Sequence, residues 1–78
     1  MAELLEILAK YMVDEPDKVS VTKLENERGL LLELRVAPDD MGKVIGRQGR
    51  VARALRAVVK AAASATGERV SVEIMDQA

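Results

Sequence analysis

The stretch KVIGRQGRVAR, residues 43–53, carries two glycines three positions apart, with an apolar pair before them and a series of arginines after them. Glycine tolerates the backbone conformations that end a helix or make a tight turn. We therefore expect a short helix over 38–45 that stops at Gly46, and a longer helix over 49–66. The stretch predicts two consecutive helices joined by the four-residue loop 46–49.

The remaining segments show the periodicities of one further helix and three strands. Apolar residues recur at spacings of three and four over 2–13, which predicts an amphipathic helix. Apolar and polar residues alternate in 18–25 and 30–36 on either side of the turn NERG, and again in 69–75. The order helix, strand, strand, helix, helix, strand predicts an α+β domain with helices on one face of a three-stranded sheet.

Length and composition limit the class of protein. A chain of 78 residues is long enough for one small domain, which we expect to span 1–78, and its 49% apolar content allows a packed core. The chain lacks cysteine and histidine, which excludes disulfides, thiolate chemistry and nearly all soft-metal sites. No apolar run approaches the roughly 18 residues of a membrane span, and no basic signal segment is present. We therefore expect a cytoplasmic protein with no membrane span, metal or cofactor.

Charges are distributed unevenly along the chain. The segment 41–67 holds six basic residues and no acid, whereas the rest of the chain holds six basic residues and thirteen acids. This asymmetry predicts an anion-binding face on an otherwise acidic protein, although a solvated helix face would show the same pattern. The six basic residues are Lys43, Arg47, Arg50, Arg53, Arg56 and Lys60.

A helical projection of 49–66 separates basic from apolar residues. One side would face solvent as a basic stripe that begins at the glycine loop, and the other would pack on the sheet. The expected stripe consists of Arg50, Arg53, Arg56 and Lys60, and the expected packing side of Val51, Leu55, Val58, Val59 and Ala62.

The glycine spacing excludes the two common phosphate-binding loops. A P-loop requires G-x-x-x-x-G-K-[ST], whereas Gly49 is followed here by Arg50 and Val51. The dinucleotide fingerprint G-x-G-x-x-G fails because Val44 stands at its first glycine, and because a helix rather than a strand precedes the loop. A purely structural helix-turn-helix remains open, although it does not explain an arginine and a glutamine within the loop.

Catalysis is not expected either. Histidine and cysteine are absent, and the three serines lie in predicted strands or helix, so no nucleophile and base form a pair. The adjacent Asp39 and Asp40 fit helix capping better than convergence on one substrate. We therefore expect no enzyme and no small-molecule substrate.

The sequence VIGRQGRVARAL, residues 44–55, resembles the K-homology (KH) motif, in which a G-x-x-G loop clamps about four backbone nucleotides of single-stranded RNA. The element order resembles the type II KH arrangement over essentially the whole chain. The short length and the stretch GKVIGRQGR resemble the small stand-alone bacterial proteins of the KhpA (YlqC-like) family. The resemblance implies RNA contacts from Lys43, Ile45, Gly46, Arg47, Gln48, Gly49, Arg50 and Arg53.

Apolar residues near the loop have two candidate roles. Val36, Val44 and Ile45 could line a groove for bases or form core beneath it, and core is the expected role of Val44.

A second hypothesis concerns protein partners. The segment 57–65, AVVKAAASA, has small side chains that would let another helix approach, although packing on the domain's own sheet would also account for them. The alternative function is thus an interaction module with little intrinsic RNA affinity. The family resemblance implies a homodimer, pairing with a KH protein of the KhpB (Jag-like) type, and a role as post-transcriptional regulator or RNA chaperone linked to cell shape and division.

Overall fold

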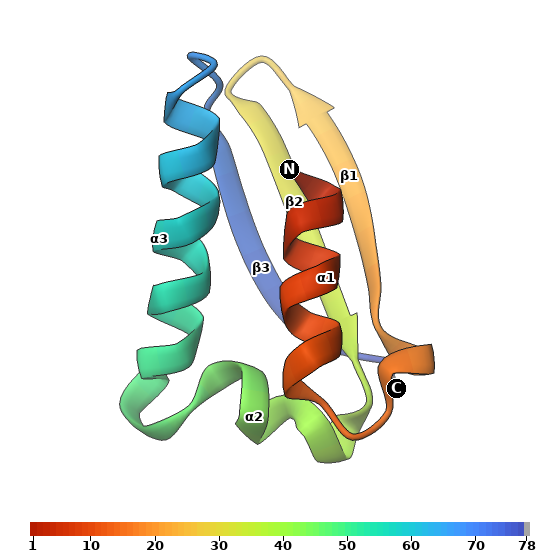
Figure 1. The fold of residues 1–78 in the computed structure, drawn as a ribbon. Coiled ribbons are helices and arrows are strands. Elements are labelled where there is room, and N and C mark those ends of the chain that lie inside the picture. Colours follow the sequence, from red (N-terminus) through yellow and green to blue (C-terminus); the bar gives the residue numbers. More distant parts are fainter. Residues whose placement is uncertain (78) are drawn as a thin grey trace.

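In the computed structural model, which describes residues 1–77, three helices lie against one face of a three-stranded sheet (Figure 1). This arrangement confirms the predicted α+β class and the predicted order of elements. The elements are α1 (Ala2–Met12), β1 (Ser20–Asn26), β2 (Gly29–Val36), α2 (Met41–Ile45), α3 (Arg50–Ser64) and β3 (Val70–Asp76), with single 3-10 turns η1 (Pro16–Lys18), η2 (Pro38–Asp40) and η3 (Arg47–Gly49).

The sheet is mixed, with the order β1-β2-β3. β1 and β2 form the predicted antiparallel hairpin, in which Asn26 pairs with Gly29. β3 runs parallel to β2, and a parallel return requires a crossover connection, which α2 and α3 supply. The crossover places the glycine loop between α2 and α3 at one end of the molecule and the hairpin tip at the other (Figure 1).

The core lies between the sheet and the three helices. Alternate residues of β2 and β3 face the helices, as the two-residue period predicted. Each helix contributes short or branched side chains to the same cluster, α2 through Val44 alone. Its buried members are Leu5, Ala9, Val19, Leu32, Leu34, Val36, Val44, Leu55, Val59, Ala63, Val70 and Val72.

The packing side of α3 differs from the one predicted. Val58, expected in the core, is 46% exposed, and Val51 and Ala62 are only half-buried. The fully buried side instead includes Ala52 and Ala63 together with Leu55 and Val59, which were predicted correctly. The projection favoured the larger apolar residues, whereas alanines at the contact let the helix approach the sheet closely.

Helix α1 shows a similar difference. Tyr11 follows Leu4 and Leu8 at the spacings of three and four that predicted the apolar side of this helix, yet it is 88% exposed, and Ile7 is 54% exposed. The core contacts come from Leu5 and Ala9, with Leu8 partly buried beside them.

No helix in the described part of the chain combines the length and apolarity that crossing a membrane requires.

The predicted boundaries are shifted by a few residues. The helix predicted over 38–45 is divided into η2 and α2, and the helix predicted over 49–66 starts at Arg50 and ends at Ser64. β1 begins two residues later than predicted because Pro16 opens the turn η1.

Candidate nucleic-acid interface

The loop 46–49 begins where α2 ends. Val44 is fully buried and anchors α2 in the core, which confirms its expected role, and Val36 is buried as well. Ile45 is 36% exposed, so it is the member of the predicted apolar group that reaches the surface. Gly46 then turns the chain away, with φ 75° and ψ 172°, while its N–H donates to the Gly42 carbonyl at 2.9 Å.

The two glycines of the loop have different surroundings. A Cβ added at Gly46 would lie 2.9 Å from both Cβ and N of Val51 and would overlap its Cγ2, so only glycine fits there. A Cβ added at Gly49 would meet nothing within 4 Å, so the backbone at this position is open. Gly49 nevertheless has φ 74°, in the left-handed region that favours glycine.

Gln48 is the one non-glycine residue with a positive φ among residues 1–77. Its φ of 57° and ψ of 24° place it in the left-handed region, directly before the left-handed Gly49. Two consecutive left-handed residues turn the chain into α3, and the Gly49 N–H donates to the Gly46 carbonyl at 3.1 Å. This geometry leaves the Gln48 side chain exposed at the loop, where its Oε1 lies 3.4 Å from Nη2 of Arg50.

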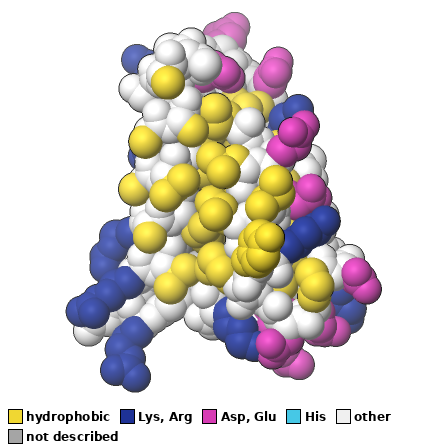
Figure 2. All heavy atoms as spheres, in the orientation of Figure 1, with side chains coloured by type: hydrophobic (Ala, Val, Ile, Leu, Met, Phe, Trp, Pro, Cys, Tyr) yellow, Lys and Arg dark blue, Asp and Glu magenta, His cyan; other side chains and the backbone are white. Residues whose placement is uncertain are grey.

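The surroundings of the loop favour anions. Arg47, Arg50 and Arg53 are exposed, and none of them forms an ion pair with an acid within residues 1–77. The first turn of α3 contains no acid, and its N-cap, Gly49, offers no side-chain acceptor. The positive end of the helix dipole therefore adds to the arginine charges. Figure 2 shows Lys and Arg side chains gathered at this end of α3.

Two basic residues of the predicted set have partners within the protein. Nε of Arg56 donates to the Val72 carbonyl at 3.2 Å, which ties α3 to the outer edge of β3. The prediction that Arg56 belongs to a solvent-facing stripe is therefore wrong, because its half-buried side chain serves the fold. The ammonium of Lys43 bonds to the Asp14 carboxylate and lies 3.5 Å from Oδ1 of Asp40.

Asp40 was expected to cap a helix, but this is wrong: it precedes α2 without a side-chain cap bond, and its buried carboxylate instead accepts the backbone N–H groups of Asp14 and Glu15. Burial acts to raise the pKa of Asp40, but the backbone N–H groups of Asp14 and Glu15 and the Lys43 charge outweigh burial and hold the pKa below its usual value. The hydrogen bond to Asp14, with the nearby Asp40 charge, raises the pKa of Lys43 above its usual value despite burial. Both groups therefore stay charged at neutral pH.

A second surface, which we call the α1/α3 apolar face, covers the outer sides of these two helices (Figure 2). Its large side chains are Ile7, Tyr11 and Val58, which are 54%, 88% and 46% exposed. On α3 and its C-cap residue Ala65, the exposed residues Ala54, Val58, Ala61 and Ala65 follow at spacings of four, three and four, so they lie on one side of the helix.

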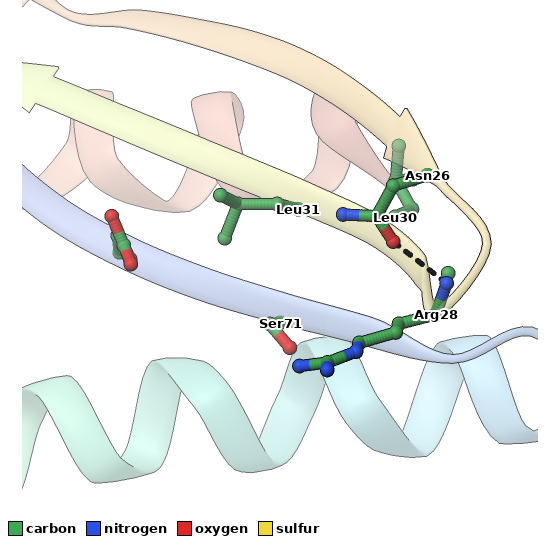
Figure 3. A pocket seen from close by; sticks show the side chains of 7 residues that line it. Asn26, Arg28, Leu30, Leu31 and Ser71 are labelled. Atoms are coloured by element: carbon green, nitrogen blue, oxygen red, sulfur yellow. Dashed lines mark hydrogen bonds between the residues drawn. The ribbon is translucent and has the colours of Figure 1, made fainter.

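Within residues 1–77, four shallow surface hollows lie near the β1–β2 hairpin, away from the loop. A shallow hollow of about 220 Å³ opens at the hairpin, lined by residues that include Asn26, Arg28, Leu31 and Ser71 (Figure 3). Asn26 Oδ1 accepts the backbone N–H of Arg28 at 2.7 Å and closes the turn there. The residues that line the hollow form no group with evident binding chemistry, so the loop remains the candidate site.

Comparison with known proteins identifies one family over nearly the whole chain. The family model described as KhpA/KhpB, KH domain matches residues 2–74. A protein of Clostridium acetobutylicum named RNA-binding protein KhpA is 56% identical over 75 residues, which cover 96% of this chain and all of that protein. Proteins of the same name from Streptomyces coelicolor and Aquifex aeolicus are 53% and 47% identical, over 97% of this chain and 92% and 96% of their own. With its α+β fold of type II KH order, the chain belongs to the KhpA/KhpB KH-domain family.

Proposed function

We propose that this protein binds single-stranded RNA and that the loop 46–49 clamps the sugar–phosphate backbone. The observation that carries the proposal is the open backbone at Gly49, which lies among three arginines that have no acidic partner within residues 1–77. Relatives that are 47% to 56% identical bear the name RNA-binding protein, which supports the same ligand.

The geometry suggests a role for each part of the loop. A phosphate can approach the backbone at Gly49, because a Cβ there would meet nothing within 4 Å, and the positive end of α3 begins directly after it. Arg47, Arg50 and Arg53 supply charge for neighbouring phosphates, and the Gln48 amide can donate to or accept from a sugar hydroxyl. The exposed part of Ile45 provides an apolar surface for a base beside the loop.

One such loop gives weak binding that depends on salt, because most of the interaction is electrostatic. The chain, taken as a single KH unit over 1–78, has no paired nucleophile and base. We therefore propose a binding role, as a post-transcriptional regulator or RNA chaperone, rather than an enzymatic one.

The test replaces the two loop residues that carry exposed side chains. Arg47→Asp/Gln48→Asp should lower affinity for a fluorescent single-stranded RNA by about tenfold or more at about 0.1 M salt, because repulsion replaces attraction. Arg28→Asp/Ser64→Asp is the matched control, since it changes the net charge equally at exposed positions at the hairpin end. Circular dichroism would check that both variants remain folded.

The control variant should bind nearly as tightly as the unaltered protein. Equal losses in the two variants would mean that only net charge matters, and an unchanged affinity in the loop variant would refute the clamp.

We propose a second role for the α1/α3 apolar face as a contact surface for another copy of this chain. The face has three large exposed apolar side chains, and its α3 ridge has residue spacings suited to helix–helix contact. Alanine-rich ridges allow two helices to approach closely, and a dimer would present two RNA loops, which raises the effective affinity for one RNA. A KH protein of the KhpB type is the alternative occupant, in keeping with the name of the matching family.

Sedimentation equilibrium at micromolar concentration tests this contact. Val58→Glu places a charge in the middle of the ridge and should shift a dimer to monomer without unfolding, because Val58 is already 46% exposed. Lys60→Glu, which alters an exposed residue of the same helix outside the ridge, is the control. A monomer in the unaltered protein that binds a KhpB-type partner through Val58 would instead support the heteromer.

A further inference from the structure

A buried carboxylate joins the helix that carries the loop to a distant part of the chain. Asp40, the residue before α2, is 1% exposed and is the one charged side chain that is buried within residues 1–77. Its Oδ1 accepts the N–H of Asp14 and its Oδ2 accepts the N–H of Glu15, each at 3.1 Å. Both donors lie in the linker between α1 and β1, so Asp40 connects segments 25 and 26 residues apart.

Lys43 completes this arrangement from the next turn of the chain. Its ammonium bonds to the exposed Asp14 carboxylate and lies 3.5 Å from Oδ1 of Asp40. The buried carboxylate thus has two backbone donors and a balancing charge, as a buried charge requires. We call the set Asp14, Glu15, Asp40 and Lys43 the linker clasp.

Helix α2 depends on contacts outside itself. It comprises five residues, and a helix of that length is not stable alone. Val44 holds it in the core, and the linker clasp holds its first turn. Because Gly46 follows α2 directly, any rotation or fraying of α2 would displace the RNA loop.

We propose that Asp40 and Lys43 are positioning residues, which hold α2 against the α1–β1 linker and so place the loop 46–49 for RNA without contacting RNA. This inference rests on the proposed function of the loop. It also replaces the role of phosphate contact that the sequence predicted for Lys43. If the loop is less well held in the free protein, it must become ordered when RNA binds. The loss of conformational entropy in that step weakens binding.

The sharpest test alters Asp14, whose side chain is 79% exposed, so that its removal leaves the core intact. Asp14→Ala removes one of the two carboxylate partners of Lys43 and leaves Asp40 as the other, and Asp17→Ala removes the same charge from a neighbouring exposed position as a control. We expect Asp14→Ala to bind single-stranded RNA about three- to tenfold more weakly than Asp17→Ala, a typical size for coupling through a positioning contact. Equal or tighter binding by Asp14→Ala would overturn the proposal, since tighter binding would show that Asp14 withholds Lys43 from phosphate.

Salt dependence gives a second readout that separates contact from positioning. Each phosphate contact to a single strand contributes about 0.7 to the slope of log affinity against log salt. Arg50→Ala should reduce the slope by about that amount, whereas Lys43→Ala should weaken binding at every salt concentration and keep the slope unchanged. Equal reductions of the slope in the two variants would place Lys43 on the RNA and overturn the proposal.

Amide hydrogen exchange in the free protein tests whether the linker clasp holds the loop, independently of whether the protein binds RNA. The amides of Gly46 and Gly49 donate to the Gly42 and Gly46 carbonyls, and their exchange should be faster in Asp14→Ala than in Asp17→Ala. Exchange in β2 should be equal in both variants. Unchanged exchange at the loop would refute the clasp, whereas a failure of the unaltered protein to bind RNA would refute the proposed function instead.

Discussion

Replacing Gly46 and Gly49 separately with alanine should have very different effects on the free energy of unfolding, although both glycines have a φ near 75°. At Gly46 the ψ of 172° places the residue in a region that is essentially restricted to glycine, at a cost of about 1–3 kcal/mol for alanine. The new Cβ would also overlap Val51, which adds about 1–3 kcal/mol as overpacking. Alanine also has fewer conformations than glycine in the unfolded chain, and this difference offsets the loss of stability by about 0.4–1 kcal/mol.

The expected net loss for Gly46→Ala is therefore about 1–6 kcal/mol, centred at about 3 kcal/mol, a large part of the stability of a small domain. Gly49 has ψ 15° and an open surrounding, so Gly49→Ala carries only the left-handed backbone cost. After the same unfolded-chain correction this loss is about 1 kcal/mol, or roughly 4–8 °C in Tm for a domain of this size.

Urea unfolding followed by circular dichroism at 25 °C measures both losses. Similar losses for the two variants would refute the argument, because they would mean that neither ψ nor the Val51 contact distinguishes the two glycines. A double-mutant cycle gives a further check: Val51→Ala should recover part of the overpacking cost, about 1 kcal/mol, when combined with Gly46→Ala, because it removes the overlapping Cγ2 and leaves the Cβ and N contacts. No coupling between the two changes would contradict the close contact.

Gly49→Ala also separates folding from binding. The variant should remain folded yet bind RNA more weakly, because its methyl group occupies the space open to phosphate. Unchanged RNA affinity in a folded Gly49→Ala protein would contradict the proposed approach of the RNA backbone.

Three further predictions concern single residues. Gln48→Gly should stabilise the free protein by about 0.5–1 kcal/mol in urea unfolding, since glycine has no left-handed cost, and a destabilised variant would contradict this. Arg56→Met should cost about 1 kcal/mol through the lost bond to Val72 but leave the salt slope of RNA binding unchanged, whereas Arg53→Met should reduce that slope by about 0.7. Because the pKa of Asp40 is lowered in the folded state, its stabilisation is present above about pH 4 and is lost as the pH falls through the folded pKa. Unfolding of the unaltered protein and of Asp40→Asn should therefore show the larger difference at pH 7 and a smaller one at pH 3, and an equal difference would refute the assignment.

Local pattern was sufficient for the order of elements and for the loop. Helical and strand periodicities depend on neighbours within one or two turns, so they predicted α1, the hairpin, α3 and β3 within a few residues. Gly46 was expected to end a helix and does so, because the chain turns there with a positive φ. The exposed Arg47 and Gln48 follow from the same local geometry.

Which side of a helix is buried depends on the neighbouring elements. Val58 and Tyr11 are apolar enough to be assigned to the core, yet both are exposed, because the sheet meets α3 and α1 through short side chains such as Ala52 and Ala9. A hydrophobicity pattern ranks apolar residues by size, and it holds no information about how closely two elements approach. The exposed residues left over by this packing form the α1/α3 apolar face.

The sequence by itself determined that this protein is a small α+β domain with a glycine loop at the start of a basic helix, because those features arise from residues close together in the chain. Only the tertiary structure decided what the individual charges do. Arg56 bonds to a strand edge 16 residues away, and Asp40 binds linker amides 25 and 26 residues away, so no local pattern contains either pairing. Lys43 and Arg50 look alike as members of a basic segment, and they differ because folding brings Asp14 and Asp40 to Lys43 and brings no acid within residues 1–77 to Arg50.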